Sequence, residues 1–296
     1  MRVVSVGECM VELSGAGQGL WRQAFAGDTF NTAWYLRARL PQSAQVDYLT
    51  CVGSDAISDS MLGFMAGAGI GTGCITRHPT RSPGLYMIDL KDGERSFTYW
   101  RDASAARTLA DDENHLARSF LGADLIYFSG ITLAILTPDR RRALLAALAA
   151  ADAKVAFDSN MRLRLWRDAA EMREWIMRGA AVADIALPSF DEETATFGDA
   201  DPAATAQRYR AAGVTEVLVK NGGGLMLGID GDAVQDLPPG ARLTPIDTTG
   251  AGDSFNGGYL AARLQGAGMA EAVAQGHATA ARVIMHPGAL VPHDML

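Results

Sequence analysis

The sequence predicts an α/β fold in which a doubly wound, mainly parallel sheet lies between layers of helices. Two observations support this prediction: short strand-like runs alternate with helical patterns, and several of these runs are apolar throughout. Strands without polar positions are typical of a sheet that helices cover on both faces. The strand-like runs are residues 2–6, 46–52, 125–129, 154–157, 184–187 and 216–220.

Helix signals occupy the intervals between these strands. Thr137-Pro138 and Asp201-Pro202 each place a good N-cap residue before a proline, which is favourable at the first helical position. Helices are therefore expected at residues 140–151 and 202–212. The alternation of strands with helices indicates crossover connections, and hence parallel strands.

Two segments break this alternation, and we expect them to form a small antiparallel β lid. Residues 8–27 contain two extended pieces around a glycine-rich turn. Residues 81–101 are typical of a hairpin, with strands at 84–90 and 95–100 and a turn at Lys91-Asp92-Gly93. A hinged flap of this kind can keep water out of a reaction site. The chain is thus predicted to be one domain, residues 1–296, with its lid formed by segments 8–27 and 81–101.

The composition is that of a globular enzyme, with 48% hydrophobic and 20% charged residues. The net charge of −8 argues against general nucleic-acid binding, which needs a surplus of Lys and Arg. Three widely spaced cysteines predict neither a disulfide framework nor a zinc site. The N-terminus lacks signal-peptide features and no apolar helix is long enough to span a bilayer, so we expect a cytoplasmic protein without membrane partners.

The most informative segment is DTTGAGDSF at residues 247–255, which precedes a helix-compatible run. The small residues Gly250, Ala251 and Gly252 would leave the first backbone N–H groups of that helix uncovered. Together with the helix dipole, these groups could form an anion hole. Asp253 would lie beside it, where a carboxylate can accept a proton from an attacking hydroxyl. The simpler alternative is a capped helix start in which Asp253 only favours the dipole.

This intact string resembles the signature of the ribokinase-like (PfkB) carbohydrate kinases. The resemblance implies a ribokinase-like fold, ATP as phosphate donor, Asp253 as catalytic base, and an anion hole at residues 250–252. It also implies that Asp247 and Thr249 lie near a monovalent cation such as K⁺. The glycine-rich motifs of P-loop enzymes (GxxxxGKS/T) and dinucleotide-binding enzymes (GxGxxG) do not occur in the sequence.

The resemblance also suggests nucleotide contacts at the ends of three strands. They involve Asn160, Ser189, Lys220, Asn221 and Gly222, in addition to Gly250 and Gly252. Ser189 stands where the family commonly has the asparagine of Asn-x-x-Glu, whereas Glu192 keeps the acid, which implies a contact to Mg²⁺ through water. An ordinary acidic helix start at residues 191–193 is the alternative. A late helix around residues 277–285 should pack near the adenine, with His277 in a structural role.

Within the family, the sequence most resembles the 2-keto-3-deoxygluconate kinases. The segments that carry this resemblance are GECMVEL (7–13), GDTFNTA (27–33), RSPGLY (81–86), GERSFTYWR (93–101) and DSNMRLRLW (158–166). It implies ATP-dependent phosphorylation of 2-keto-3-deoxygluconate at its terminal C6 hydroxyl. The implied substrate-binding residues are Gly27, Asp28, Asn31, Tyr86, Tyr99, Arg101 and Arg162, together with Asp253.

The residues themselves favour an acidic substrate. Strand alternation places Phe97, Tyr99 and Arg101 on one face of the lid, and Arg162 follows a main-sheet strand. Arg101 and Arg162 could therefore clamp one carboxylate from two sides. Alternatively, these arginines could pair with structural acids. A kinase of a neutral sugar such as fructose or ribose, or a non-catalytic sugar-binding regulator, also remains open. Apolar lid residues such as Leu85, Met87 and Phe97 suggest a homodimer paired through the lids.

Overall fold

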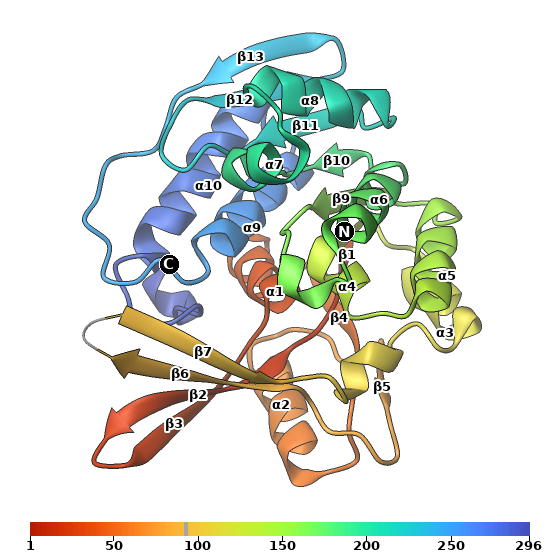
Figure 1. The fold of residues 1–296 in the computed structure, drawn as a ribbon, viewed down its shortest axis with the longest axis vertical. Helices are drawn as coiled ribbons and strands as arrows, with labels where there is room; N and C mark the ends of the chain where they lie inside the picture. The colour runs from red at the N-terminus through yellow and green to blue at the C-terminus, as the bar shows by residue number, and fades with distance from the viewer. Residues whose placement is uncertain (92–93) are drawn as a thin grey trace.

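The computed structural model describes residues 1–91 and 94–296 and is built around a nine-stranded sheet (Figure 1). The strand order is β13-β12-β11-β10-β9-β8-β1-β4-β5. All neighbouring strands from β5 to β11 are parallel, whereas β12 and β13 run antiparallel to their neighbours. This confirms the mainly parallel sheet. The strands are β1 Arg2–Val6, β4 Gln45–Val52, β5 Ile75–Arg77, β8 Leu125–Ser129, β9 Lys154–Asp158, β10 Ile185–Ala186, β11 Glu216–Val219, β12 Met226–Asp230 and β13 Ala233–Leu237.

Helices cover both faces of this sheet, as its apolar strands predict. One face packs on α1 Asp28–Arg39, α2 Ala56–Gly67, α9 Ala251–Leu264 and α10 Met269–Val283. The other packs on α3 Glu113–Phe120, α4 Gly130–Ala134, α5 Pro138–Ala149, α6 Ala169–Ala180, α7 Phe190–Phe197 and α8 Pro202–Ala211. Short 3₁₀ turns lie at η1 Ala105–Thr108, η2 Leu163–Leu165 and η3 His293–Met295. In β1, Val3 faces the first layer while Val4 and Val6 face the second, so that strand has no side exposed to water.

Four further strands form the lid, in the order β3-β2-β6-β7, and project from the main domain below α1 (Figure 1). They are β2 Met10–Gly17, β3 Leu20–Ala26, β6 Leu85–Lys91 and β7 Glu94–Trp100. The pairs β2–β3 and β6–β7 are antiparallel hairpins, but β2 and β6 pair in parallel. Both central strands leave the main domain in the same direction, which explains the parallel pair. The tip of the expected Lys91-Asp92-Gly93 turn lies outside the described residues.

Some element boundaries differ from the sequence prediction. Helix α5 begins directly at Pro138, and β10 has two residues where four were expected. Helix α10 begins at Met269, well before the predicted 277–285 segment. His277 lies within α10 with its ring 5.1 Å from that of Phe255, and burial lowers its pKa. No helix in the described ranges has both the length and the apolar character that a membrane span requires.

The side of the sheet to which successive strands are added changes between β1 and β8, although all these strands are parallel. From β1 the chain builds β4 and β5 on one side, and it then returns to add β8 to β11 on the other. In open α/β sheets, ligands bind at the carboxyl ends of the strands near such a switch point. The ends of β8, β9 and β11, the start of α1 and the start of α9 all meet at this edge, beneath the lid.

Candidate active site

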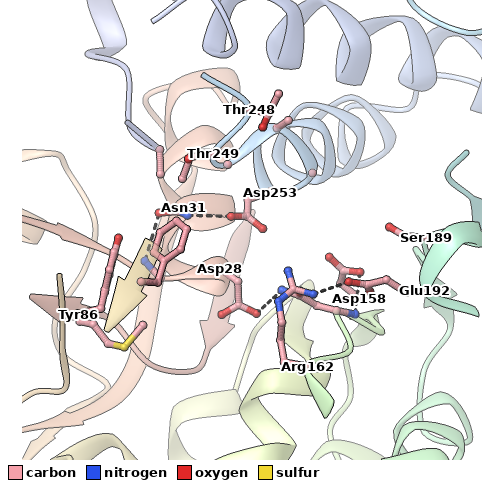
Figure 2. Close-up of a pocket in the computed structure, with 18 of the residues that line it drawn as sticks. Asp28, Asn31, Tyr86, Asp158, Arg162, Ser189, Glu192, Thr248, Thr249 and Asp253 are labelled. Carbon is pink, nitrogen blue, oxygen red and sulfur yellow. Dashed lines mark hydrogen bonds and ion pairs between the residues drawn. The ribbon is translucent and has the colours of Figure 1, made fainter. Parts of the chain in front are cut away.

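A cavity of about 480 Å³ opens at this edge between the lid and the main domain (Figure 2). The residues that Figure 2 labels line it from the lid strand β6, from α1, from the end of β9 and the connection that follows it, and from the starts of α7 and α9. Its lining brings together most of the predicted site. The lining residues are Met10, Gly27, Asp28, Asn31, Tyr86, Phe97, Tyr99, Asp158, Asn160, Arg162, Arg164, Ser189, Glu192, Lys220, Thr248, Thr249, Gly250, Ala251, Gly252, Asp253 and Ala289.

The N-terminus of α9 faces the cavity, and two glycines make this possible. Gly250 is the N-cap with φ of 75°, in the left-handed region, and an added Cβ would lie 2.9 Å from the backbone oxygen of Ala289. Gly252 has open space where its Cβ would be. Nothing covers the helix start at Gly252, and the positive end of the helix dipole can stabilise an anion here, whereas the Ala251 N–H donates to the Thr248 carbonyl at 3.2 Å.

Asp253 lies in the first turn of α9, beside this helix start. Its carboxylate accepts a hydrogen bond of 2.8 Å from Asn31 Nδ2 (Figure 2). Burial raises the pKa of Asp253 to about 8, and the negative charges of Asp28 and Asp158 act in the same direction. Asn31 and Lys220 oppose this rise. A carboxyl group with such a pKa can take up a proton near neutral pH, as a general base must.

Asp28, at the start of α1, is held by hydrogen bonds from two other elements. Its Oδ2 accepts from the Ser129 hydroxyl and, at 2.8 Å, from Asn160 Nδ2. Burial raises the pKa of Asp28 above its ordinary value. Asn160, which the sequence suggested for the nucleotide, therefore contacts Asp28, with φ of 28° at the turn after β9.

Lys220, at the end of β11, belongs to a buried polar network under α9. Its Nζ lies 3.4 Å from both carboxylate oxygens of Asp158 and donates to Asn256 Oδ1 at 3.1 Å. Asn256 Nδ2 donates to Asp158 at 2.7 Å and to the Tyr127 hydroxyl at 3.1 Å. Neither Asp158 nor Asn256 was among the site residues predicted from the sequence. Two sequence features could have identified them: Asp158 ends an apolar strand, and Asn256 lies about one helical turn after Asp253.

Glu192 and Arg162 form an ion pair. The sequence had suggested Glu192 for the water shell of Mg²⁺ and Arg162 for the substrate carboxylate. Glu192 also accepts a hydrogen bond of 3.0 Å from the Met161 backbone N–H, and Ser189 lines the cavity nearby. Within residues 1–91 and 94–296, no group of three or more His, Cys, Asp or Glu side chains could hold a metal ion. A carboxylate that contacts metal-bound water fits Mg²⁺, which keeps several waters and binds mainly to substrate phosphates.

Arg101 is not where the sequence placed it. Its guanidinium forms a buried ion pair with Glu8, only 6% of its side chain is exposed, and it does not line the cavity. The reason is that Arg101 follows β7 at the base of the lid, where it meets Glu8 between β1 and β2. Among residues 1–91 and 94–296, Arg101 Nε and Glu8 Oε1 find no hydrogen-bond partner. Arg164, which was not selected, lines the cavity instead.

Other predicted contacts lie at the edge of the site or outside it. Asn221 Nδ2 donates to the Leu225 carbonyl at 3.0 Å, and neither Asn221 nor Gly222 lines the cavity. The ring of Tyr86 lines the cavity, but its hydroxyl donates to Glu12. Gly27 lines the cavity at the start of α1, where its N–H donates to Asn31 Oδ1 at 3.3 Å.

Asp247 fastens the loop that precedes α9. It accepts hydrogen bonds from the backbone N–H groups of Thr249 at 2.9 Å and Gly288 at 2.6 Å. This holds the Thr248–Gly250 turn against the segment that contains Ala289. Thr249 lines the cavity, whereas Asp247 lies behind the anion hole.

Comparison with known proteins agrees with this arrangement. The model of the pfkB family carbohydrate kinases matches residues 1–294. A 2-dehydro-3-deoxygluconokinase from Dickeya dadantii (strain 3937) is 39% identical over 306 residues, which covers 99% of this chain and 98% of that protein. Among solved structures, a PfkB protein from Polaromonas sp. JS666 has a TM-score of 0.84 at 28% identity, with 98% of each chain covered. A fructokinase from Xylella fastidiosa with bound ATP has a TM-score of 0.82 at 25% identity, covering 100% of this chain and 94% of that one. The chain therefore belongs to the pfkB family of carbohydrate kinases.

Proposed function

We propose that this kinase transfers the γ-phosphoryl group of ATP to the C6 hydroxyl of 2-keto-3-deoxygluconate, also called 2-dehydro-3-deoxygluconate. The products would be the 6-phosphate and ADP. The reaction is supported mainly by one observation: the Asp253 carboxylate and the open N-terminus of α9 meet in one cavity. The full-length similarity to the Dickeya dadantii enzyme supports the choice of acceptor.

In this mechanism, Asp253 accepts the proton of the C6 hydroxyl as its oxygen attacks the γ-phosphorus. The bond between that phosphorus and the ADP oxygen breaks, and ADP carries away the electron pair. Negative charge on the transferring group falls next to the N-terminus of α9, whose backbone is fixed before the reaction begins. When bound, Mg²⁺ supplies neutralisation of the phosphate charge, and Glu192 would contact its water shell.

We assign the two halves of the cavity to the two substrates. Gly27, Asp28 and Asn31 lie on the sugar side, where short polar groups can bind hydroxyls, and the rings of Tyr86 and Tyr99 form the lid surface above them. Ser189, Lys220 and the glycines of α9 lie toward the ATP phosphates. Asp247 and Thr249 would lie near a bound monovalent cation.

A direct test compares Asp253→Asn with the parent enzyme in an assay of ADP release. We expect kcat to fall about 10³-fold, because the amide cannot accept the proton, while ATP affinity changes little. Asp139→Asn, a strongly exposed carboxylate on α5, is the matched control and should keep parental activity. Activity of Asp253→Asn within about tenfold of the parent would contradict its role as base.

The acceptor is tested with a panel of sugar acids and neutral sugars. We expect kcat/KM for 2-keto-3-deoxygluconate to exceed that for fructose or ribose by about 100-fold or more. A preference for either neutral sugar would overturn the acidic acceptor but not the kinase chemistry. No ADP release with any acceptor would support a sugar-binding regulator instead.

A further inference from the structure

Asn256 is a buried polar residue for which the proposed reaction has no direct use. It lies on α9 and is fully buried, and it does not line the cavity. Its neighbours Lys220 and Asp158 do line the cavity, although only 7% and 4% of their surfaces are exposed. Any effect of Asn256 on the bound substrates must therefore pass through these two charged side chains.

The ion pair between Lys220 and Asp158 is unusually long for a buried pair. Lys220 Nζ lies 3.4 Å from each of the two carboxylate oxygens of Asp158. Charge-assisted hydrogen bonds of this kind usually measure about 2.7–2.9 Å, and the pair of Arg263 with Glu216 in this protein measures 2.7 Å. Because attraction between opposite charges grows as they approach, a further contact must keep Lys220 and Asp158 apart.

Asn256 supplies that contact, because its amide bonds to both members of the pair. Its Oδ1 accepts from Lys220 Nζ at 3.1 Å, and its Nδ2 donates to Asp158 Oδ2 at 2.7 Å and to the Tyr127 hydroxyl at 3.1 Å. The partners fix the orientation of the amide, since an ammonium group only donates and a carboxylate only accepts. A reversed amide would set its NH₂ group against the ammonium and its oxygen against the carboxylate.

This arrangement leaves the ammonium group of Lys220 able to bind an anion in the cavity. The group has three N–H donors, of which one bonds to the neutral oxygen of Asn256, while the contacts to Asp158 are long. A close pair with Asp158 would neutralise the cation, and a phosphate group would then have to compete with the carboxylate for it. The amide bond to Asn256 takes no charge away from Lys220.

We propose that Asn256 is a positioning residue for phosphate binding: it holds Lys220 away from Asp158 and so keeps the ammonium group available to the phosphates of ATP. This inference rests on the proposed function, which places Lys220 toward those phosphates, and deepens it by naming the residue that keeps the cation available. The alternative is a structural role, in which Asn256 only satisfies buried polar groups between α9 and the sheet. That role predicts a loss of stability without a selective effect on ATP.

The first test measures ATP affinity in Asn256→Leu, whose side chain is similar in size but makes no hydrogen bond. Without the amide, Lys220 should pair closely with Asp158, so we expect Kd and KM for ATP to rise about 10- to 30-fold. The value of kcat and KM for 2-keto-3-deoxygluconate should stay within about threefold of the parent. Asn256→Ser, whose hydroxyl is too short to bond to both groups, should shift Kd in the same direction and replaces the leucine variant if that variant does not fold. Asn114→Leu, at an exposed position on α3, is the control and should bind ATP like the parent.

Two double variants determine whether Asn256 acts through this pair. Asp158→Asn combined with Asn256→Leu removes the competing carboxylate, so Kd for ATP should return to within about threefold of the parent. Lys220→Met alone should raise Kd about 100-fold, and adding Asn256→Leu should change it no further, because the ammonium group is already absent. Losses that simply add in this second pair, or no recovery with Asp158→Asn, would overturn the inference.

Calorimetric titration with ATP and Mg²⁺ in the absence of acceptor gives these Kd values, so the test does not depend on the acceptor. If the parent binds ATP but does not phosphorylate 2-keto-3-deoxygluconate, the proposed reaction fails, whereas loss in Asn256→Leu and recovery with Asp158→Asn still support the role of Asn256. If Lys220→Met binds ATP like the parent, both the inference and the place of Lys220 beside the phosphates are wrong. If Asn256→Leu loses stability in urea unfolding while its Kd stays within about threefold of the parent, the residue is only structural and the inference is overturned.

Discussion

Asp253 must satisfy two requirements that oppose each other. It needs to be shielded from water so that its pKa is high enough for proton transfer, and it needs to face a cavity that a hydroxyl can enter. The first turn of α9 provides both, because the helix is packed against α1 while its N-terminus opens toward the lid. The cost is a carboxyl group whose ionised form is unfavourable in the folded protein.

The raised pKa predicts how activity depends on pH. Asp253 must be deprotonated to act as a base, so kcat/KM should rise about tenfold per pH unit below about pH 8 and level off above it. The small residual rate of Asp253→Asn should not follow this curve. A parental profile that is flat from about pH 5 to about pH 9 would contradict the raised pKa of Asp253.

The same shift predicts an effect on stability. The folded protein keeps a proton on Asp253 that the unfolded chain releases above about pH 4, so this group destabilises the fold increasingly as pH rises to about 8. Asp253→Asn cannot ionise and should be more stable than the parent by about 1–2 kcal/mol near pH 8, with little difference near pH 4. Urea unfolding at a series of pH values measures this. Equal stability throughout would show that the ionised carboxylate carries no such penalty.

At the scale of elements, the start of α9 depends on glycines for two different reasons. Gly250 needs its left-handed conformation and has backbone atoms within contact distance of its missing Cβ, whereas Gly252 lies inside the helix with open space. The first glycine lets the helix begin at this point. The second leaves room for an anion above the N–H groups.

The two glycines should therefore respond differently to alanine. Gly250→Ala should lower the free energy of unfolding by about 2–3 kcal/mol and reduce activity, because both the backbone and Ala289 must shift. Gly252→Ala should leave stability equal or about 0.5–1 kcal/mol higher, yet reduce kcat because the methyl group lies over the anion hole. Gly266→Ala, also left-handed but with open space, is the control and should cost less than Gly250→Ala. If Gly252→Ala were fully active, the anion hole would not lie at that position.

At the scale of the whole molecule, the lid and the main domain meet at a buried charge pair. Glu8 lies where the chain enters the lid and Arg101 where it leaves, so their ion pair ties both ends of the lid together. Farther out, Leu20, Trp21, Phe97 and Trp100 keep 41–65% of their surface exposed. Pairing of two lids into a dimer, which the sequence suggested, remains a prediction that light scattering with size-exclusion chromatography can test.

Arg101→Met tests whether that pair is structural or part of the substrate site. Removing the arginine leaves the Glu8 carboxylate buried without a cation, so we expect a loss of about 3–5 kcal/mol in stability. Glu8→Gln combined with Arg101→Met should recover much of this loss, as measured by denaturant unfolding. If Arg101→Met instead kept its stability and raised KM only for the acidic substrate, the role that the sequence suggested for Arg101 would be correct.

The sequence by itself determined the layered fold, the lid segments and the Gly-Ala-Gly-Asp helix start. These features depend on neighbouring residues: apolar runs, turn residues and the small side chains of one helical turn. The tertiary structure decided which arginines face the cavity, that β2 pairs with β6 in parallel, and that Lys220, Asp158 and Asn256 form one network. A long charged side chain pairs with whichever acid the fold brings near it, and the pKa of Asp253 depends on burial and on charges from other elements. Such partners are distant along the chain, so local sequence patterns contain no record of them.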